Sequence, residues 1–394
     1  MKIPKKILSL VLSVAFGVAL LVIVLLKFPL HNVISAFTHV TPKLVFAYLA
    51  VSGTIMFVLS YRWKVLLDAE GYRNISFFHL VSYKIIDYGV SYITPTAKIG
   101  GEPVRAAMLM RHGISFKEGL TTVTIDKTIE LSFTLLMFIL GCIFLILGVT
   151  LPGGVIVFLL VISALLLFLI WKFYSRILQG KPIFISFFRF MRLHKFAFLA
   201  KYQHAIIDFE KPIMKFYQEK KKAYFIALLL TIFAFSLSMV EFHVLLLMVG
   251  VNASLGVVFM VFSVVGMAFV IPVPMGLGSL EAMQAWLFSA LGLSSAAGIG
   301  LAMITRSRDL IWVLLAVVFS LYYGSLRKVL DEAYNSKYNN PIVKMTFLRN
   351  GKPAKIKIKL HQKHHEAFVH VQSLRKRYLD FNRMMEGKFR KKEK

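Results

Sequence analysis

Long apolar runs, separated by short polar or basic stretches, make up most of the chain. A helix needs about 17–25 apolar residues to cross a bilayer. Six runs approach or reach that length, over about residues 7–26, 44–61, 119–149, 155–171, 223–249 and 297–323. Two further apolar stretches, about 77–93 and 255–271, end at prolines and glycines. The pattern predicts an all-α polytopic membrane protein with about six transmembrane helices and two re-entrant hairpins.

The second interruption reads Ile-Pro-Val-Pro-Met-Gly-Leu-Gly-Ser-Leu-Glu over residues 271–281. Its prolines remove backbone donors, and Gly276 and Gly278 permit backbone conformations that other residues avoid. Because unpaired peptide groups are costly in hydrocarbon, such a break must pack in protein or line a wet cavity. Glu281 then opens a new helix, where an acid favours the positive end of the helix dipole.

The first interruption has the same order of residue types. Residues 94–105 read Thr-Pro-Thr-Ala-Lys-Ile-Gly-Gly-Glu-Pro-Val-Arg, so proline, glycine and then glutamate again precede a helix. Acids follow Glu102 after 24 and 28 residues, within the next apolar run, and charges follow Glu281 after 25 and 28 residues. This equal spacing predicts an internal repeat.

The charge distribution predicts how the chain is oriented. The 47 Lys and Arg residues gather at the N-terminus, in a loop over residues 62–73, in a linker over 172–222 and after residue 323. Basic loops stay in the cytoplasm, so both termini are expected there. The first hairpin then opens inward and the second outward. Units over about 44–149 and 223–323 would be inverted repeats, an architecture in which transporters bind substrate between the repeats.

Composition excludes several classes of protein. Hydrophobic residues make up 58% of the 394 residues, and the mean hydropathy is +0.71, which excludes a soluble globular protein. The formal net charge of +28 does not indicate a nucleic-acid partner, because no recognition element accompanies it. The single cysteine excludes an intrachain disulfide. No zinc-peptidase, P-loop or serine-hydrolase motif is present, so we expect no catalytic residues, metal or cofactor.

Two regions outside the apolar runs have their own patterns. The linker over 172–222 is basic and amphipathic, which is typical of a segment lying on a membrane interface with anionic lipid. The basic tail, 327–394, is expected in the cytosol; it alternates apolar and polar residues around Asn350, which predicts a β-hairpin, and has helical spacing over 367–385. We therefore expect a transmembrane domain over 1–326 and a small appendage.

Charged residues inside apolar helices are the strongest candidates for a site, because they are costly there and usually mark a pathway. The residues we expect to bind substrate are Lys98, Gly100, Gly101, Glu102, Arg105, Asp126, Glu130, Pro274, Gly276, Gly278, Glu281, Arg306, Arg308 and Asp309. The arginines and Lys98 would contact phosphate, and the acids would orient them or meet a cationic headgroup.

Simpler interpretations of these residues remain open. Asp126 and Glu130 share a helical face and could instead reach water at the cytoplasmic end of their helix. Glu102 and Glu281 could serve only as helix caps, and Glu281 could also pair with an arginine of the last helix. Lys98 could be a solvated loop residue.

The two interrupted stretches, 94–105 with the following Gly-Ile-Ser and 272–281, resemble those of the lysylphosphatidylglycerol synthase transmembrane region. The resemblance covers about residues 7–326 and implies a flippase-like, multi-pass protein of the cell membrane that moves lipids between leaflets. Some members carry a fused cytosolic transferase of some 300 residues. Only about 70 residues follow the last apolar run here, so the lysyltransferase activity is not expected.

The leading hypothesis is a lipid flippase or headgroup transporter whose partners are membrane lipids with anionic headgroups. An alternative, which the resemblance also suggests, is a membrane subunit or enzyme of a polyprenyl-phosphate glycolipid pathway, working with a cytosolic lipid-modifying or glycosyltransferase partner. It predicts a divalent-metal requirement. A third hypothesis is a scaffold whose basic linker and tail recruit a cytosolic protein, in which case the tail and not the hairpins would be essential.

Overall fold

The computed structural model describes residues 37–94, 100–192, 196, 203–271, 273–323, 342–349 and 352–359. The chain divides into two compact units, Met1–Leu326 and Arg327–Lys394. The helix predicted over residues 7–26 and the one predicted over 367–385 lie outside the described residues.

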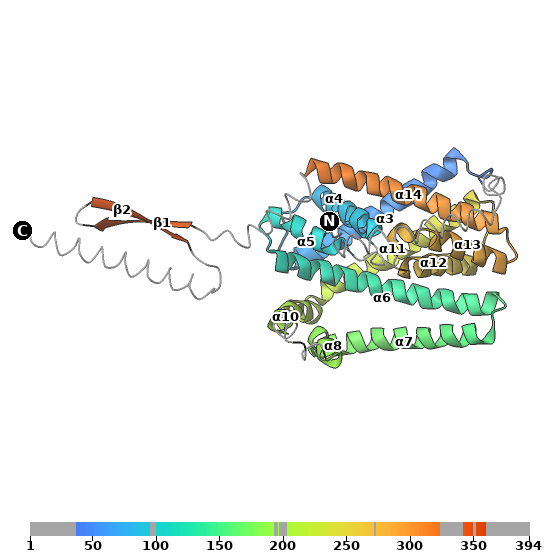
Figure 1. The fold of residues 1–394 in the computed structure, drawn as a ribbon, viewed down its shortest axis with the longest axis horizontal. Helices are drawn as coiled ribbons and strands as arrows, with labels where there is room; N and C mark the ends of the chain where they lie inside the picture. Colours follow the sequence, from blue (N-terminus) through green and yellow to red (C-terminus); the bar gives the residue numbers. More distant parts are fainter. Residues whose placement is uncertain are drawn as a thin grey trace, which may run out of the picture. The chain divides into compact units, whose positions relative to one another are not determined.

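The first unit is helical (Figure 1). Its elements are α3 (Pro42–Ala69), α4 (Phe77–Ile93), α5 (Glu102–Leu109), η1 (Met110–His112), α6 (Phe116–Gly148), α7 (Gly153–Leu178), α8 (Phe184–Phe190), α10 (Gln203–Glu219), α11 (Lys221–Met248), α12 (Leu255–Val270), η3 (Pro274–Gly276), α13 (Ser279–Ala290) and α14 (Ser295–Tyr322). Among the described helices, α3, α6, α7 and α11 are long and apolar enough to cross a membrane. The prediction of a helical polytopic membrane protein is confirmed.

Local sequence signals explain where the longest helices start. Thr41 accepts a hydrogen bond from the backbone N–H of Leu44 and caps α3. Ser115 and Glu118 form a capping box at the start of α6, in which each side chain accepts from the other residue's backbone N–H. These contacts satisfy donors that a helix end leaves unpaired.

The prediction of a basic loop starting at Arg62 is wrong, because α3 continues to Ala69. Trp63 is fully buried, while Tyr61 is half exposed. The guanidinium of Arg105 lies over the Trp63 ring at 4.6 Å. A prediction from hydropathy alone ends this helix too early, because it treats Arg62 as exposed, whereas Arg62 is buried in ion pairs.

The predicted break after α12 is present as a tight turn. Met275, Gly276 and Gly278 have φ values of 60°, 58° and 74°, in the left-handed region. The Ser279 hydroxyl donates to the carbonyl oxygens of Ala268 and Gly276, which ties α13 to the end of α12. The first break separates α4 from α5, and residues 95–99 within it lie outside the described residues.

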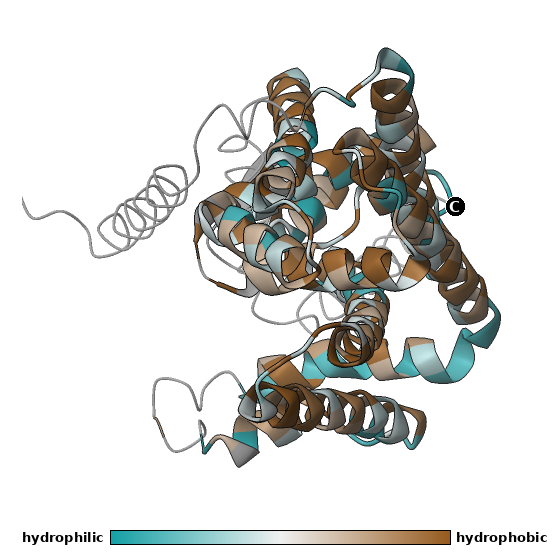
Figure 2. Ribbon diagram, turned by 90° about the vertical axis from the view of Figure 1, so that its right-hand side faces the viewer, coloured by the Kyte–Doolittle hydropathy of each residue, from teal (hydrophilic) through white to brown (hydrophobic). Residues whose placement is uncertain are grey.

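The helices of the two broken segments pack in a crossed arrangement. The first arm of one segment, α4, packs against α14, and the first arm of the other, α12, packs against α6. The second arms, α5 and α13, pack against the long helix that follows each of them, and α3 packs along α11. Apolar residues predominate along these helices (Figure 2).

The second unit contains an antiparallel pair of strands, β1 (Ile342–Arg349) and β2 (Lys352–Lys359). Their register pairs Ile342 with Lys359 and Arg349 with Lys352, so the pair encloses the Asn-Gly dipeptide of the sequence.

Candidate functional site

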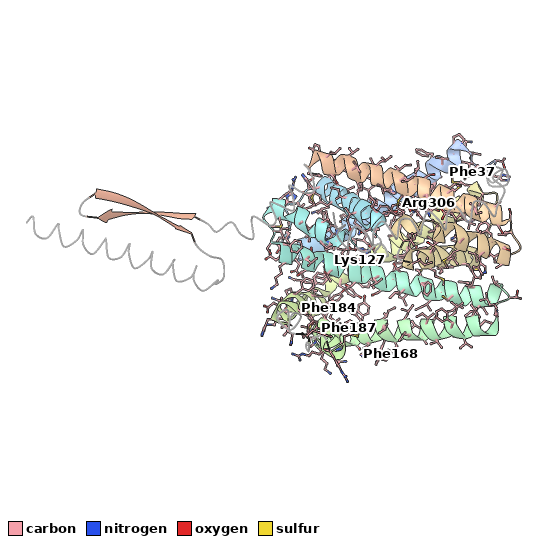
Figure 3. The ribbon with its side chains drawn as sticks, in the orientation of Figure 1. Phe37, Lys127, Phe168, Phe184, Phe187 and Arg306 are labelled. Carbon is pink, nitrogen blue, oxygen red and sulfur yellow. The ribbon has the colours of Figure 1, made fainter. Side chains whose placement is uncertain are left out.

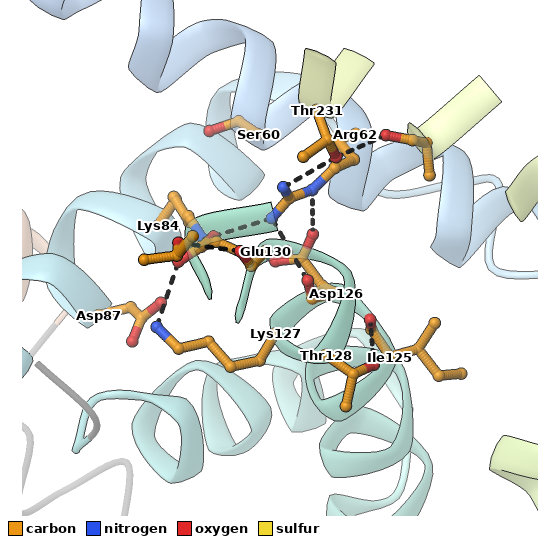
Figure 4. A network of polar contacts seen from close by, with 12 residues as sticks. Ser60, Arg62, Lys84, Asp87, Ile125, Asp126, Lys127, Thr128, Glu130 and Thr231 are labelled. Atoms are coloured by element: carbon orange, nitrogen blue, oxygen red, sulfur yellow. Dashed lines mark hydrogen bonds and ion pairs between the residues drawn. The ribbon is translucent and has the colours of Figure 1, made fainter. Parts of the chain in front are cut away.

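Ion pairs join eight charged residues from α3, α4, α5 and α6, which we call the first network. Its four cations and four carboxylates are Arg62, Lys84, Asp87, Glu102, Arg105, Asp126, Lys127 and Glu130. Its formal charges therefore balance. Figure 4 labels the members from α3, α4 and α6.

Asp126 occupies the dry centre of the first network and is 0% exposed. It accepts hydrogen bonds from Arg62 Nε at 2.7 Å and Arg105 Nη1 at 3.0 Å, and Lys84 Nζ lies 3.4 Å away. Arg62 also donates to the hydroxyl of Thr231 on α11 at 3.2 Å. One carboxylate thus joins three helices to α6, and it is paired within protein rather than extended toward water.

The rim of the first network is partly exposed. The side chains of Lys127 and Glu130 are 25% and 22% exposed. Lys127 Nζ lies 3.2 Å from Glu130 Oε1 and 3.2 Å from Glu102 Oε1, so it bridges α5 and α6. Glu130 also accepts from Arg62 Nη2 at 2.8 Å. A polar group from outside the protein could therefore reach the rim without opening the centre.

The joint between α4 and α5 is packed directly against the first network. The Gly101 backbone N–H donates to the Ser91 hydroxyl at 2.8 Å, and Ser91 donates to Asp87 Oδ1 at 3.5 Å. Arg105 Nε lies 3.5 Å from Asp87 Oδ2. Asp87 therefore pairs with α5, and Lys84 pairs with Asp126 and Glu130 of α6.

We expect Gly101→Ala to loosen this joint. A Cβ at Gly101 would overlap the backbone carbonyl and carboxylate of Asp87, which are held by the contacts above. Overpacking of this kind costs about 1–3 kcal/mol. Thermal unfolding in detergent should show a clear loss of stability, whereas the control Gly266→Ala, which meets nothing within 4 Å, should unfold like wild type. Equal stability of both variants would contradict the described joint.

A second network lies where α14 meets α11, α13 and α4. It comprises Tyr88, Glu241, Glu281, Arg306, Arg308 and Asp309. Figure 3 places Arg306 on α14 and Lys127 on α6, each within the helical bundle.

Arg306 forms a clamp on the turn between α12 and α13. Its Nε and Nη2 donate to the Glu281 carboxylate, the latter at 2.8 Å. Its Nη1 donates to the Met275 carbonyl at 2.8 Å and its Nη2 to the Gly276 carbonyl at 2.7 Å. Of the roles that the sequence left open for Glu281, the structure shows the pairing with an arginine of the last helix. In the described part of the chain, no side-chain cap is formed at the start of α13.

Arg308 and Asp309 form the rest of the second network. Arg308 Nη1 donates to Glu241 of α11 at 2.6 Å, and its Nε and Nη2 donate to Asp309 Oδ1. Tyr88 of α4 donates to the same Asp309 oxygen at 2.6 Å. Since α4 also carries Lys84 and Asp87, one helix contributes to both networks.

The other predicted site residues lie near these networks or outside the described part. Gly100 is half-buried and Gly101 buried beside the first network, and Gly276 and Gly278 are buried in the second break. Pro274 begins the η3 turn. Lys98 lies outside the described residues.

The list of predicted site residues omitted Arg62, Lys84, Asp87, Lys127, Tyr88 and Glu241. A constant spacing could have found several of them. Between the two predicted repeat units, 44–149 and 223–323, four pairs of charged positions lie 179 residues apart: Arg62 and Glu241, Glu102 and Glu281, Lys127 and Arg306, Glu130 and Asp309. Comparing the two broken segments at this fixed offset points to Arg62, Lys127 and Glu241 without any structure.

Aromatic and histidine side chains tie η1 to the C-terminal end of α14. Arg111 donates to the Tyr323 carbonyl, and the Tyr83 hydroxyl lies 3.1 Å from His112 Nε2. Burial lowers the pKa of His112, and the neighbouring His79 and Arg111 lower it further. His112 is thereby favoured in its neutral form.

Among the described residues, no group of three or more His, Cys, Asp or Glu could hold a metal ion.

The fold and its buried charges define a polytopic helical membrane protein whose ion pairs lie beside broken helices. The chain belongs to the family described as the lysylphosphatidylglycerol synthase TM region, whose family model matches residues 7–317. A comparison with curated proteins found no match. Family membership assigns the protein a lipid-related function in a membrane.

Proposed function

We propose that the protein moves a lipid headgroup between leaflets along a polar path formed by the two networks. The observation that carries this proposal is a shared arrangement at both breaks. Glu102, at the start of α5, pairs with Lys127 of α6 at 3.2 Å, and Glu281, in the first turn of α13, pairs with Arg306 of α14. Each broken segment is thus joined to its following long helix by a buried glutamate and a cation, and charges at such depth usually serve a pathway.

The helix packing supports two repeated units related by a pseudo-two-fold axis. Exchanging α3–α6 with α11–α14 converts the α4–α14 contact into the α12–α6 contact and leaves the α3–α11 contact unchanged. A pseudo-two-fold axis would produce this exchange, and the distribution of Lys and Arg along the chain favours an axis in the membrane plane. Transporters built from such inverted repeats bind their substrates near the bilayer midplane, between discontinuous helices.

A headgroup would enter by exchanging partners with an existing ion pair. Lys127 is the exposed cation of the first network, so a phosphate could replace Glu102 or Glu130 on its ammonium group. The released carboxylate could then meet a cationic part of the headgroup. Arg105 is fully buried, so in this conformation it holds Asp87 and Asp126 in place.

We place the protein in the cell membrane with both termini in the cytoplasm. The support is the clustering of Lys and Arg at the N-terminus, in the 172–222 linker and in the tail, which follows the positive-inside rule.

A leaflet-exchange assay tests the proposal. The protein is reconstituted in liposomes with a fluorescent phospholipid, and an impermeant quencher reports lipid arriving in the outer leaflet. Wild type should accelerate the exchange, and Lys127→Gln should slow it about tenfold, as expected when a charge-assisted contact of about 1.5–3 kcal/mol is lost. The control is Lys64→Gln, because among the described residues Lys64 pairs with Asp68 of its own helix and with no member of either network. No acceleration by wild type, for anionic and zwitterionic phospholipids alike, would exclude transport of these lipids.

A further inference from the structure

The end of α7 extends beyond the depth of a bilayer core. Its 26 residues span roughly 39 Å, against about 30 Å of hydrocarbon. Few of its side chains are buried, so most of α7 faces lipid. Trp171 is 65% exposed and Lys172 follows it, which is the residue order expected at a headgroup boundary.

The chain then turns into α8 through a firmly held bend, which we call the basic elbow (residues 172–192). Arg176 Nη2 donates to the Pro182 carbonyl and to the Ser186 hydroxyl, each at 2.8 Å. Buried Glu210 of α10 accepts the backbone N–H groups at the start of α8, including that of Phe184 at 2.7 Å. The bend is therefore held in place by Arg176 on the α7 side and by Glu210 on the α8 side.

The exposed face of the basic elbow is cationic. The linker over residues 172–222 has twelve Lys and Arg against three Asp and Glu. Glu210 accepts hydrogen bonds from the α8 backbone. The other two acids pair with lysines of α10: Asp208 with Lys211 at 3.7 Å, and Glu219 with Lys215 at 3.8 Å. Lys181, Arg189 and Arg192 are exposed on the elbow itself.

Large apolar side chains lie among these cations. Leu178, Phe187 and Met191 are exposed, and Phe187 is 61% exposed. Figure 3 shows Phe184 and Phe187 close to the end of α7 that carries Phe168. The elbow is thus continuous with the lipid-facing surface of α7, which an acidic protein or a nucleic acid would not cover.

We propose that the basic elbow binds anionic phospholipid of the adjacent leaflet. Lys181, Arg189 and Arg192 contact phosphate groups, and Leu178 and Phe187 enter the acyl boundary. This site shares no ion pair with the two networks and does not depend on lipid transport, although Tyr174 of the elbow donates to the Ser132 hydroxyl of α6 at 3.1 Å.

Quenching of Trp171 tests the proposal locally, without contribution from the basic tail. Full-length protein is placed in phosphatidylcholine nanodiscs with a minor fraction of phosphatidylglycerol. Bromine is carried either by the phosphatidylglycerol or by an equal amount of phosphatidylcholine. The Trp171 signal is the difference between wild type and Trp171→Phe. We expect brominated phosphatidylglycerol to quench it about fivefold more, the factor that corresponds to about 1 kcal/mol, the attraction of one basic residue to an anionic surface.

In the triple variant Lys181→Gln, Arg189→Gln, Arg192→Gln, both brominated lipids should quench the Trp171 fluorescence equally. The control is Lys43→Gln. Lys43 is an exposed lysine at the N-terminal end of α3, outside the elbow, and this variant should keep the wild-type preference. High salt should weaken the wild-type preference as well, because it screens exposed charges, and this measurement does not depend on the variant folding. Equal quenching by both lipids in wild type at low salt would overturn the proposal, as would a preference that salt leaves unchanged.

Discussion

Asp126→Ala is expected to lower the free energy of unfolding by about 3–5 kcal/mol, as found when one partner of a buried ion pair is removed. Asp126 is fully buried and contacts Arg62, Arg105 and Lys84. Its loss leaves the first network with an excess of buried positive charge and leaves the two guanidinium groups without their shared acceptor. The effect is measured by reversible unfolding in mixed micelles of a mild detergent and dodecyl sulfate.

Glu130→Ala is the matched control, because Glu130 lies one helical turn away and also contacts Arg62 and Lys84. Its side chain is partly exposed, so water can take over part of its role and the loss should be smaller. Equal losses for the two variants, or an Asp126→Ala protein as stable as wild type, would contradict the distinction between a dry centre and a partly exposed rim.

The sequence was sufficient to predict the broken helices because Pro and Gly act locally. Glu281 could be expected to pair with an arginine of the last helix, since it follows the break and Arg306 lies on a helix that must pack nearby. The shared order of residue types in the two breaks also pointed to the charged helices on which Asp126 and Asp309 lie.

The sequence did not reveal which distant charges would meet. Arg62 has the appearance of a cytoplasmic loop residue, because a hydropathy window treats any arginine as a boundary. Its burial depends on Asp126, 64 residues away, and on Thr231, which lies 169 residues away on α11. Such pairing follows from how α3 packs against α6 and α11, and periodicity along one helix contains no information about that packing.

Asp309 illustrates the same limit at short range. Its spacing from Arg306 places both on one helical face, which suggested that it orients Arg306. In the structure Asp309 accepts from Arg308 and Tyr88, while Arg306 is held by Glu281 and the η3 carbonyls. Partners from other elements therefore decide the role of each charge.

Arg306→Lys is expected to release the turn between α12 and α13 and to slow lipid exchange strongly. Arg306 donates to a buried carboxylate and to two backbone carbonyls at once, and a single ammonium cannot reproduce that planar fork. Met275 has a positive φ of 60°, a conformation that costs about 1–3 kcal/mol and persists only when its surroundings hold it. Losing even one charge-assisted hydrogen bond, worth about 1.5–3 kcal/mol, should raise the opening frequency of the turn roughly tenfold or more.

Hydrogen exchange by mass spectrometry, read on a peptide covering residues 275–281, measures this opening directly. Arg308→Lys is the matched control, because Arg308 is two residues away on α14 but contacts Glu241 and Asp309 rather than the turn. If both variants exchange at the wild-type rate in this peptide, Arg306 does not hold the turn. If Arg306→Lys opens the turn and lipid exchange is unchanged, the clamp is real but the second break is not part of the lipid path. The two measurements therefore separate the structure of the break from its proposed function.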